Sequence, residues 1–162
     1  MNMKKKKILK RVLISLAVVI VLLLAVAGIY LADYRKPDDS ALKAINNPVV
    51  NVTVTQETGW MAFAPDAATD RAIIFYPGAK GRYDAYATIA EKLAQNNIMC
   101  ILVDAPLNMS LLDVNAADKV KPHFPEIKHW YIGGHSMGGS AAEQYVKKHQ
   151  RENEGLIMVA IV

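Results

Sequence analysis

The order of apolar and polar residues divides the chain into an apolar segment, a polar segment and an alternating segment. Residues 12–32 form an uncharged apolar run, and a helix of that length, at about 1.5 Å per residue, spans a bilayer core of about 30 Å. Residues 33–48 are polar and contain Pro37 and Pro48, which predicts a linker. From residue 49 onward, apolar runs alternate with amphipathic ones, so residues 49–162 are expected to form the folded domain.

Within this domain the pattern predicts strands that alternate with helices. Strands are expected at residues 49–55, 60–64, 71–76, 98–103, 130–132 (with a start near 128) and 155–162. Helices are expected at residues 83–96, 111–121 and 136–150. The first two strands form an antiparallel hairpin, whereas the later strands are apolar on both faces. The fold class is therefore α/β, with a mostly parallel sheet covered by helices on both faces and preceded by one transmembrane helix.

Charge is concentrated at the N-terminus. The chain has 19 basic and 15 acidic residues, a formal net charge of +4. Six of the basic residues, and no acidic ones, lie within residues 1–11, so the remainder has 13 basic and 15 acidic residues, or −2. This distribution gives no support for nucleic-acid binding, which requires a basic face on the folded part. Basic residues ahead of a first span favour a cytoplasmic N-terminus, which places the domain on the extracytoplasmic side of the cell membrane.

A cleaved signal peptide is the alternative interpretation of the apolar run, since Ala25-Val26-Ala27 has the small-x-small pattern of a cleavage site. The run continues past this site to Ala32, which favours an uncleaved anchor. Both interpretations export the domain.

Residue types that bind metals or cofactors do not occur in a recognisable pattern. The only cysteine, Cys100, lies in an apolar strand, where a small buried side chain is expected. No metal-ligand spacing and no dinucleotide- or phosphate-binding fingerprint is present, so neither a metal nor a cofactor is expected.

The strongest chemical signal is the motif Gly134-His135-Ser136-Met137-Gly138 between a predicted strand and a predicted helix. A G-x-S-x-G sequence in this context predicts a nucleophile elbow, in which Gly134 and Gly138 leave room for a tight turn that exposes the hydroxyl of Ser136. The backbone N–H of Met137, at the helix start, is then free to stabilise an oxyanion. An ordinary glycine-rich phosphate-binding turn is the alternative.

The sequence of residues 75–108 and 115–146, together with this motif, resembles the α/β-hydrolase superfamily, in particular small bacterial members related to dienelactone hydrolases and carboxylesterases. The resemblance extends over residues 49–162. It implies a serine hydrolase that acts on a small-molecule acyl substrate, with the loop after the third strand supplying a second oxyanion donor at Ala79. In this family the acid and the histidine follow the serine in the sequence. We therefore expect a C-terminally incomplete hydrolase fold, truncated before both residues and inactive as a chain of 162 residues.

Strand polarity argues against a substitute histidine among those present. His129 begins the strand that Ser136 follows, about 20 Å away at 3.3 Å per residue. His149 lies at a similar distance along the following helix, about 20 Å at 1.5 Å per residue. His123 ends the preceding helix, and the backbone of His135 points differently from that of Ser136.

Asp104 follows a strand at the same edge of the sheet as Ser136, so it is a candidate substrate contact or displaced acid. Lys80, with Arg82, Tyr83 and Asn108, belongs to loops at that edge and is a candidate pocket residue. A different interpretation is a membrane-tethered binding protein, or a remnant, that keeps the hydrolase fold without its chemistry.

Overall fold

The computed structural model of the chain describes residues 3–159, which belong to two compact units, Met1–Asp33 and Tyr34–Val162. The first unit is a single helix, α1, Met3–Ala32. Its stretch Lys7–Tyr30 is long and apolar enough to cross a membrane, in line with the length and composition predicted for residues 12–32. Apolar side chains along this stretch are exposed, as those of a lone helix must be.

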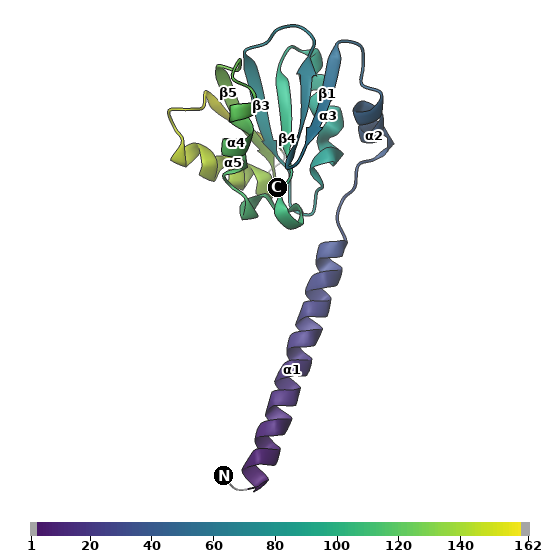
Figure 1. The fold of residues 1–162 in the computed structure, drawn as a ribbon, viewed down its shortest axis with the longest axis vertical. Coiled ribbons are helices and arrows are strands. Elements are labelled where there is room, and N and C mark those ends of the chain that lie inside the picture. Colours follow the sequence, from purple (N-terminus) through teal and green to yellow (C-terminus); the bar gives the residue numbers. More distant parts are fainter. Residues whose placement is uncertain (1–2, 160–162) are drawn as a thin grey trace. The chain divides into compact units, whose positions relative to one another are not determined.

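The second unit contains one six-stranded sheet in the order β1-β2-β4-β3-β5-β6 (Figure 1). The strands are β1 Val52–Glu57, β2 Trp60–Pro65, β3 Arg71–Tyr76, β4 Met99–Val103, β5 His129–His135 and β6 Gly155–Val159. The hairpin β1–β2 turns at Gly59 and pairs antiparallel with β4, whereas β4, β3, β5 and β6 run parallel. The predicted α/β fold with a mostly parallel sheet is confirmed.

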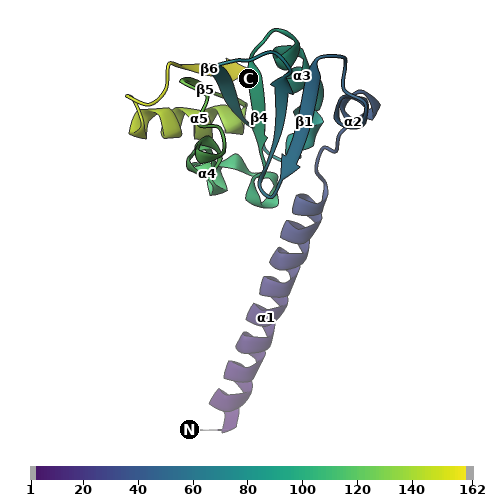
Figure 2. The same ribbon diagram turned by 45° about the horizontal axis from the view of Figure 1, so that its top comes forward.

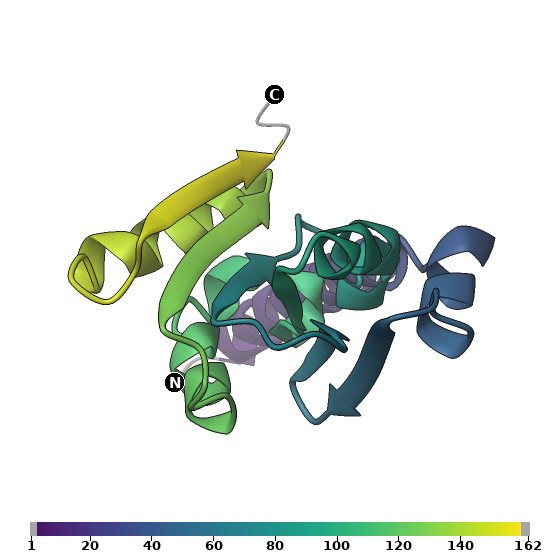
Figure 3. The same cartoon turned by 90° about the horizontal axis from the view of Figure 1, so that it is seen from above.

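Helices cover both faces of this sheet (Figure 3). They are α2 Asp39–Asn46 and α3 Ala87–Gln95 on one face, and α4 Ala116–Val120 and α5 Met137–Lys148 on the other. A hydrophobic core lies on each face of the sheet, and successive residues of β3 point into opposite cores. Ile74 packs with α4 and α5, whereas Phe75 packs with α2 and α3. All five residues of β4 are buried, which explains why this strand is apolar on both faces.

Two helical predictions differ from the structure in extent. The helix predicted at residues 83–96 begins as a 3₁₀ turn, Tyr83–Tyr86, and becomes α3. The helix predicted at residues 111–121 is reduced to α4, flanked by the 3₁₀ turns Pro106–Asn108, Ser110–Leu112 and Lys121–His123. Pro122 has no N–H and restricts the backbone before it, so it favours the end of α4.

The segment predicted as a linker, residues 33–48, is helical over half of its length (Figure 2). The carboxylate of Asp38 caps α2 by accepting a hydrogen bond from the backbone N–H of Ala41, 2.8 Å away. Ala41 and Ala44 are buried against α3, so this helix belongs to the folded unit. Within residues 33–48, the structure leaves 33–38 and 47–48 without helical structure. Of the last predicted strand, residues 160–162 lie outside the described residues.

Candidate functional site

Ser136 lies between the end of β5 and the start of α5, outside both elements. Its backbone has φ 50° and ψ −119°, which is uncommon for a residue with a side chain. The side chain is partly exposed rather than buried. A non-glycine residue in such a conformation requires surroundings that hold it there, and such positions cluster at functional sites.

The two glycines of the motif provide those surroundings. A Cβ atom on Gly134 would lie 2.3 Å from the carbonyl carbon and oxygen of Gly138, and one on Gly138 would lie 2.1 Å from the carbonyl oxygen of Tyr76. Real Cβ atoms do not approach backbone atoms this closely, so both positions require glycine. The close approach at Gly138 also places the first turn of α5 directly against the end of β3.

The loop that follows β3 lies against the residue before the serine. A Cβ on Gly78 would be 2.5 Å from Nδ1 of His135, so this loop also depends on a glycine. The Gly78 N–H donates a hydrogen bond to the hydroxyl oxygen of Tyr86 over 3.0 Å, and this hydroxyl is 3.0 Å from Nδ1 of His135. Tyr86 therefore connects the loop after β3 to the residue that precedes Ser136.

Free backbone donors flank this junction. Within residues 3–159, neither the N–H of Ala79 nor that of Met137 has a hydrogen-bond acceptor. The carbonyl oxygen of Ser136 instead accepts from the N–H groups of Gly139 and Ser140, at 2.8 and 3.3 Å. Two unpaired N–H groups beside a helix N-terminus can stabilise a negatively charged oxygen.

The four histidines have other partners. His135 contacts Tyr86. His129, at the start of β5, pairs with Glu154 at 3.0 Å and lies at the opposite end of the strand from Ser136. The ring of His123 is tilted against that of Trp60, with centroids 5.4 Å apart. Among the described residues, none of the four has a hydrogen bond to Ser136.

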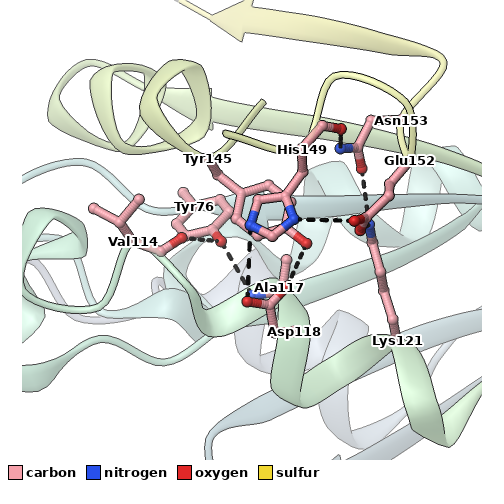
Figure 4. Close-up of polar contacts among 9 residues, drawn as sticks. All are labelled: Tyr76, Val114, Ala117, Asp118, Lys121, Tyr145, His149, Glu152 and Asn153. Atoms are coloured by element: carbon pink, nitrogen blue, oxygen red, sulfur yellow. Dashed lines mark hydrogen bonds and ion pairs between the residues drawn. The ribbon is translucent and has the colours of Figure 1, made fainter. Parts of the chain in front are cut away.

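His149 belongs to a polar cluster at the far end of α5 (Figure 4). Its ring stacks on that of Tyr145 with centroids 4.3 Å apart and lies between Asp118 and Glu152. The Tyr145 hydroxyl donates to Asp118 over 2.7 Å, and Lys121 donates to Asn153 over 3.0 Å. Burial and the hydrogen bond to Asp118 raise the pKa of Tyr145, so its hydroxyl keeps its proton. These contacts fasten α4 to the C-terminal end of α5.

Asp104 follows β4 and lines an open groove of about 520 Å³ together with Arg82, Tyr83 and Asn108. Partial burial raises the pKa of Asp104 above its ordinary value. Arg82 forms a bidentate ion pair with the buried carboxylate of Asp84, and this ion pair raises the pKa of the guanidinium. The groove thus combines three of the candidate pocket residues with Asp104, but its lining includes neither Lys80 nor Ser136.

Two residues at the site were missed by the sequence analysis. Tyr86 lies in the helix predicted at residues 83–96, and the signal that could have identified it is that a buried tyrosine usually needs a partner for its hydroxyl. Ser110 is fully buried and donates to the carbonyl oxygen of Pro77 over 2.6 Å, which ties the loop after β4 to the loop after β3. No sequence pattern identifies Ser110, because its role depends on the proximity of two loops.

Known structures share this fold at low sequence identity. A hormone-sensitive lipase from a metagenome library superimposes with a TM-score of 0.56 at 19% identity, covering 74% of this chain and 48% of that one. The protein TT1662 from Thermus thermophilus superimposes with a TM-score of 0.53 at 15% identity, covering 65% of this chain and 56% of that one. A thermostable carboxyl esterase from Bacillus coagulans superimposes with a TM-score of 0.50 at 15% identity, covering 66% of this chain and 43% of that one. The chain thus spans about half the length of these structures.

Comparison by sequence gives a family as well as a fold. No curated protein matches the chain. The sequence profile of the alpha/beta hydrolase family, however, matches residues 72–161, which include all of β3 except Arg71, the glycines of the motif and Ser136. This match covers more than half of the 162 residues, and the chain therefore belongs to the alpha/beta hydrolase family.

Proposed function

We propose that this protein is a membrane-anchored serine hydrolase that cleaves acyl esters, with Ser136 as the nucleophile. The observation that carries the proposal is the backbone of Ser136, held at φ 50° between a strand and a helix by two glycines that admit no Cβ. Such a turn presents the hydroxyl above the edge of the sheet, where a carbonyl carbon can approach it.

The oxyanion of the tetrahedral intermediate is assigned to the N–H groups of Met137 and Ala79. Both donors lack an intramolecular acceptor within the described residues. Gly138 contacts the backbone of Tyr76 and Pro77, and this contact brings the start of α5 next to the loop that contains Ala79. Removing one such donor typically costs a factor of about 100 to 1,000 in kcat.

The acid and the histidine that activate the serine are assigned to residues outside the described part of the protein. Each of the histidines at positions 123, 129, 135 and 149 contacts other groups. Asp104 is assigned to substrate contact, because it lines a groove at the carboxyl edge of the sheet. We accordingly expect residues 1–162 alone to be nearly inactive. Without a general base for the serine, the only rate enhancement that remains is the small part supplied by substrate binding and the oxyanion donors.

Anchoring is assigned to α1. The apolar stretch Lys7–Tyr30 has the length and composition of a span, and the basic residues that precede it favour a cytoplasmic N-terminus. The folded unit then lies on the extracytoplasmic side of the cell membrane.

An esterase assay tests the catalytic proposal. The protein expressed from the whole open reading frame that contains these 162 codons should hydrolyse p-nitrophenyl butyrate. Ser136→Ala should lower the rate by a factor of about 10³ or more. The matched control is Ser140→Ala, one turn along the same helix and exposed, which should retain activity. Equal rates for Ser136→Ala and the unmodified protein would contradict the proposal and favour a binding protein with a hydrolase fold.

A further inference from the structure

The loop between β4 and α4 exposes three leucines. Leu107, Leu112 and Leu111 are 59%, 57% and 39% exposed. Leu107 has φ 56° and ψ 24°, a left-handed conformation that is unfavourable for leucine and here leaves its side chain in solvent. Apolar side chains gathered on one exposed loop, rather than scattered singly, mark an interaction surface.

This loop is fixed rather than loosely attached. Ser110, between the exposed leucines, is buried and donates to the carbonyl oxygen of Pro77 over 2.6 Å. The carbonyl oxygen of Asn108 accepts from the N–H of Lys80 over 2.9 Å. Because Gly138 also lies against Pro77, the leucines are at the same edge of the sheet as Ser136.

The first residues of the folded unit are attached to this edge. The N–H of Arg35 donates to the carbonyl oxygen of Lys80 over 2.6 Å, and the carbonyl oxygen of Arg35 accepts from Arg82 over 3.0 Å. Tyr34 lines the same groove as Leu107. Only three residues separate Tyr34 from Tyr30, the last residue of the apolar stretch, and they extend over at most about 14 Å. A short connection therefore limits how far this edge can move away from a bilayer that α1 crosses.

We infer that the loop at residues 106–112 inserts its leucines into the lipid bilayer and that the hydrolase takes its acyl ester from the membrane surface. The inference rests on the proposed membrane anchoring and deepens the proposed function by giving the substrate class, an amphiphilic ester. Insertion is shallow, because Asp104 and Asp113 line the same groove and their carboxylates stay hydrated. Tyr34, Arg35 and Lys36 are residue types that favour the headgroup region.

The test uses the full chain in vesicles of phosphatidylcholine with a minor fraction of phosphatidylglycerol. An environment-sensitive fluorophore (NBD) is attached through Leu107→Cys or, as a second position, Leu112→Cys. The control position is Ala67→Cys, an exposed residue in the turn before β3 at the opposite edge of the sheet. Cys100 is fully buried, so the fluorophore reacts with the introduced cysteine.

The inference predicts a blue-shifted emission at positions 107 and 112, with quenching by doxyl-labelled lipids several-fold stronger than at position 67. Equal quenching at all three positions overturns it. A blue shift without lipid quenching also overturns it, because the loop is then covered by protein. Flotation of the vesicles after an alkaline wash tests the anchoring separately. Adding Ser136→Ala to the labelled protein should leave the quenching unchanged, because insertion does not depend on catalysis. A failure of the catalytic proposal is therefore distinguishable from a failure of this inference.

Discussion

The hydroxyl of Tyr86 lies 3.0 Å from Nδ1 of His135. The same hydroxyl accepts the N–H of Gly78, so it bridges the loop after β3 and the ring of His135. It also fixes the residue before Ser136 against the loop that contains Ala79, which is the position of the proposed second oxyanion donor.

Tyr86→Phe should lower the free energy of unfolding by about 1 to 2 kcal/mol, because the Gly78 N–H loses its partly buried acceptor. Urea unfolding in detergent micelles, followed by the fluorescence of Trp60 and Trp130, measures the change. Tyr83→Phe is the control, since the Tyr83 hydroxyl bonds only the exposed amide of Gln56 among the described residues. That substitution should change the free energy of unfolding by less than about 0.5 kcal/mol. Equal effects of the two substitutions would contradict the role of the Tyr86 hydroxyl.

Gly138→Ala should destabilise the folded unit by about 3 kcal/mol or more, because the added methyl group meets the backbone of Tyr76 at 2.1 Å. The matched substitution is Gly155→Ala, where the nearest atom is 3.4 Å away on the side chain of Tyr131. Thermal unfolding monitored by circular dichroism compares the two. A Gly138→Ala protein as stable as Gly155→Ala would mean that α5 does not approach the end of β3 as closely as described.

Asp104→Asn should stabilise the fold at neutral pH. Partial burial raises the pKa of Asp104, so ionisation is less favourable in the folded than in the unfolded state. The resulting penalty is absent below the ordinary pKa of an aspartate, about 4, and appears as the pH rises through the folded pKa. The midpoint of thermal unfolding should therefore be higher for the variant at pH 7 and equal at pH 3. A lower midpoint at pH 7 would show that the carboxylate is stabilised rather than penalised.

The thiol of Cys100 should be unreactive in the folded protein. Burial raises its pKa to about 12, so very little thiolate is present at pH 8, and the side chain has no exposed surface. Reaction with Ellman's reagent should be slower than in urea by a factor of more than about 100. Comparable rates with and without urea would place Cys100 outside the core.

Much of the folded unit could be predicted because its signals are local. The run at residues 71–76 matches β3 at both ends, since every residue after Arg71 is buried. The motif around Ser136 indicated a turn between strand and helix, because Gly134 and Gly138 are required where a Cβ atom would collide with neighbouring backbone. Helical structure in residues 39–46 was missed because the segment contains only a few apolar residues, and two small alanines, Ala41 and Ala44, form its buried face.

Other parts depend on contacts between distant residues, which a sequence pattern does not reveal. The hydrogen bond from Ser110 to Pro77 joins residues 33 positions apart, and that from Lys121 to Asn153 joins residues 32 apart. Strand polarity predicted Asp104 and Lys80 at one edge of the sheet, but it did not predict the groove that Asp104 lines, because the lining of a groove is set by the tertiary structure.

Covalent labelling tests the central claim most directly. The protein from the whole reading frame is incubated with a fluorophosphonate, digested and analysed by mass spectrometry. We predict a single adduct on the peptide that contains Ser136, absent in Ser136→Ala and unchanged in Ser140→Ala. The absence of an adduct on a folded protein, or an adduct that persists in Ser136→Ala, would contradict the assignment of Ser136 as the nucleophile.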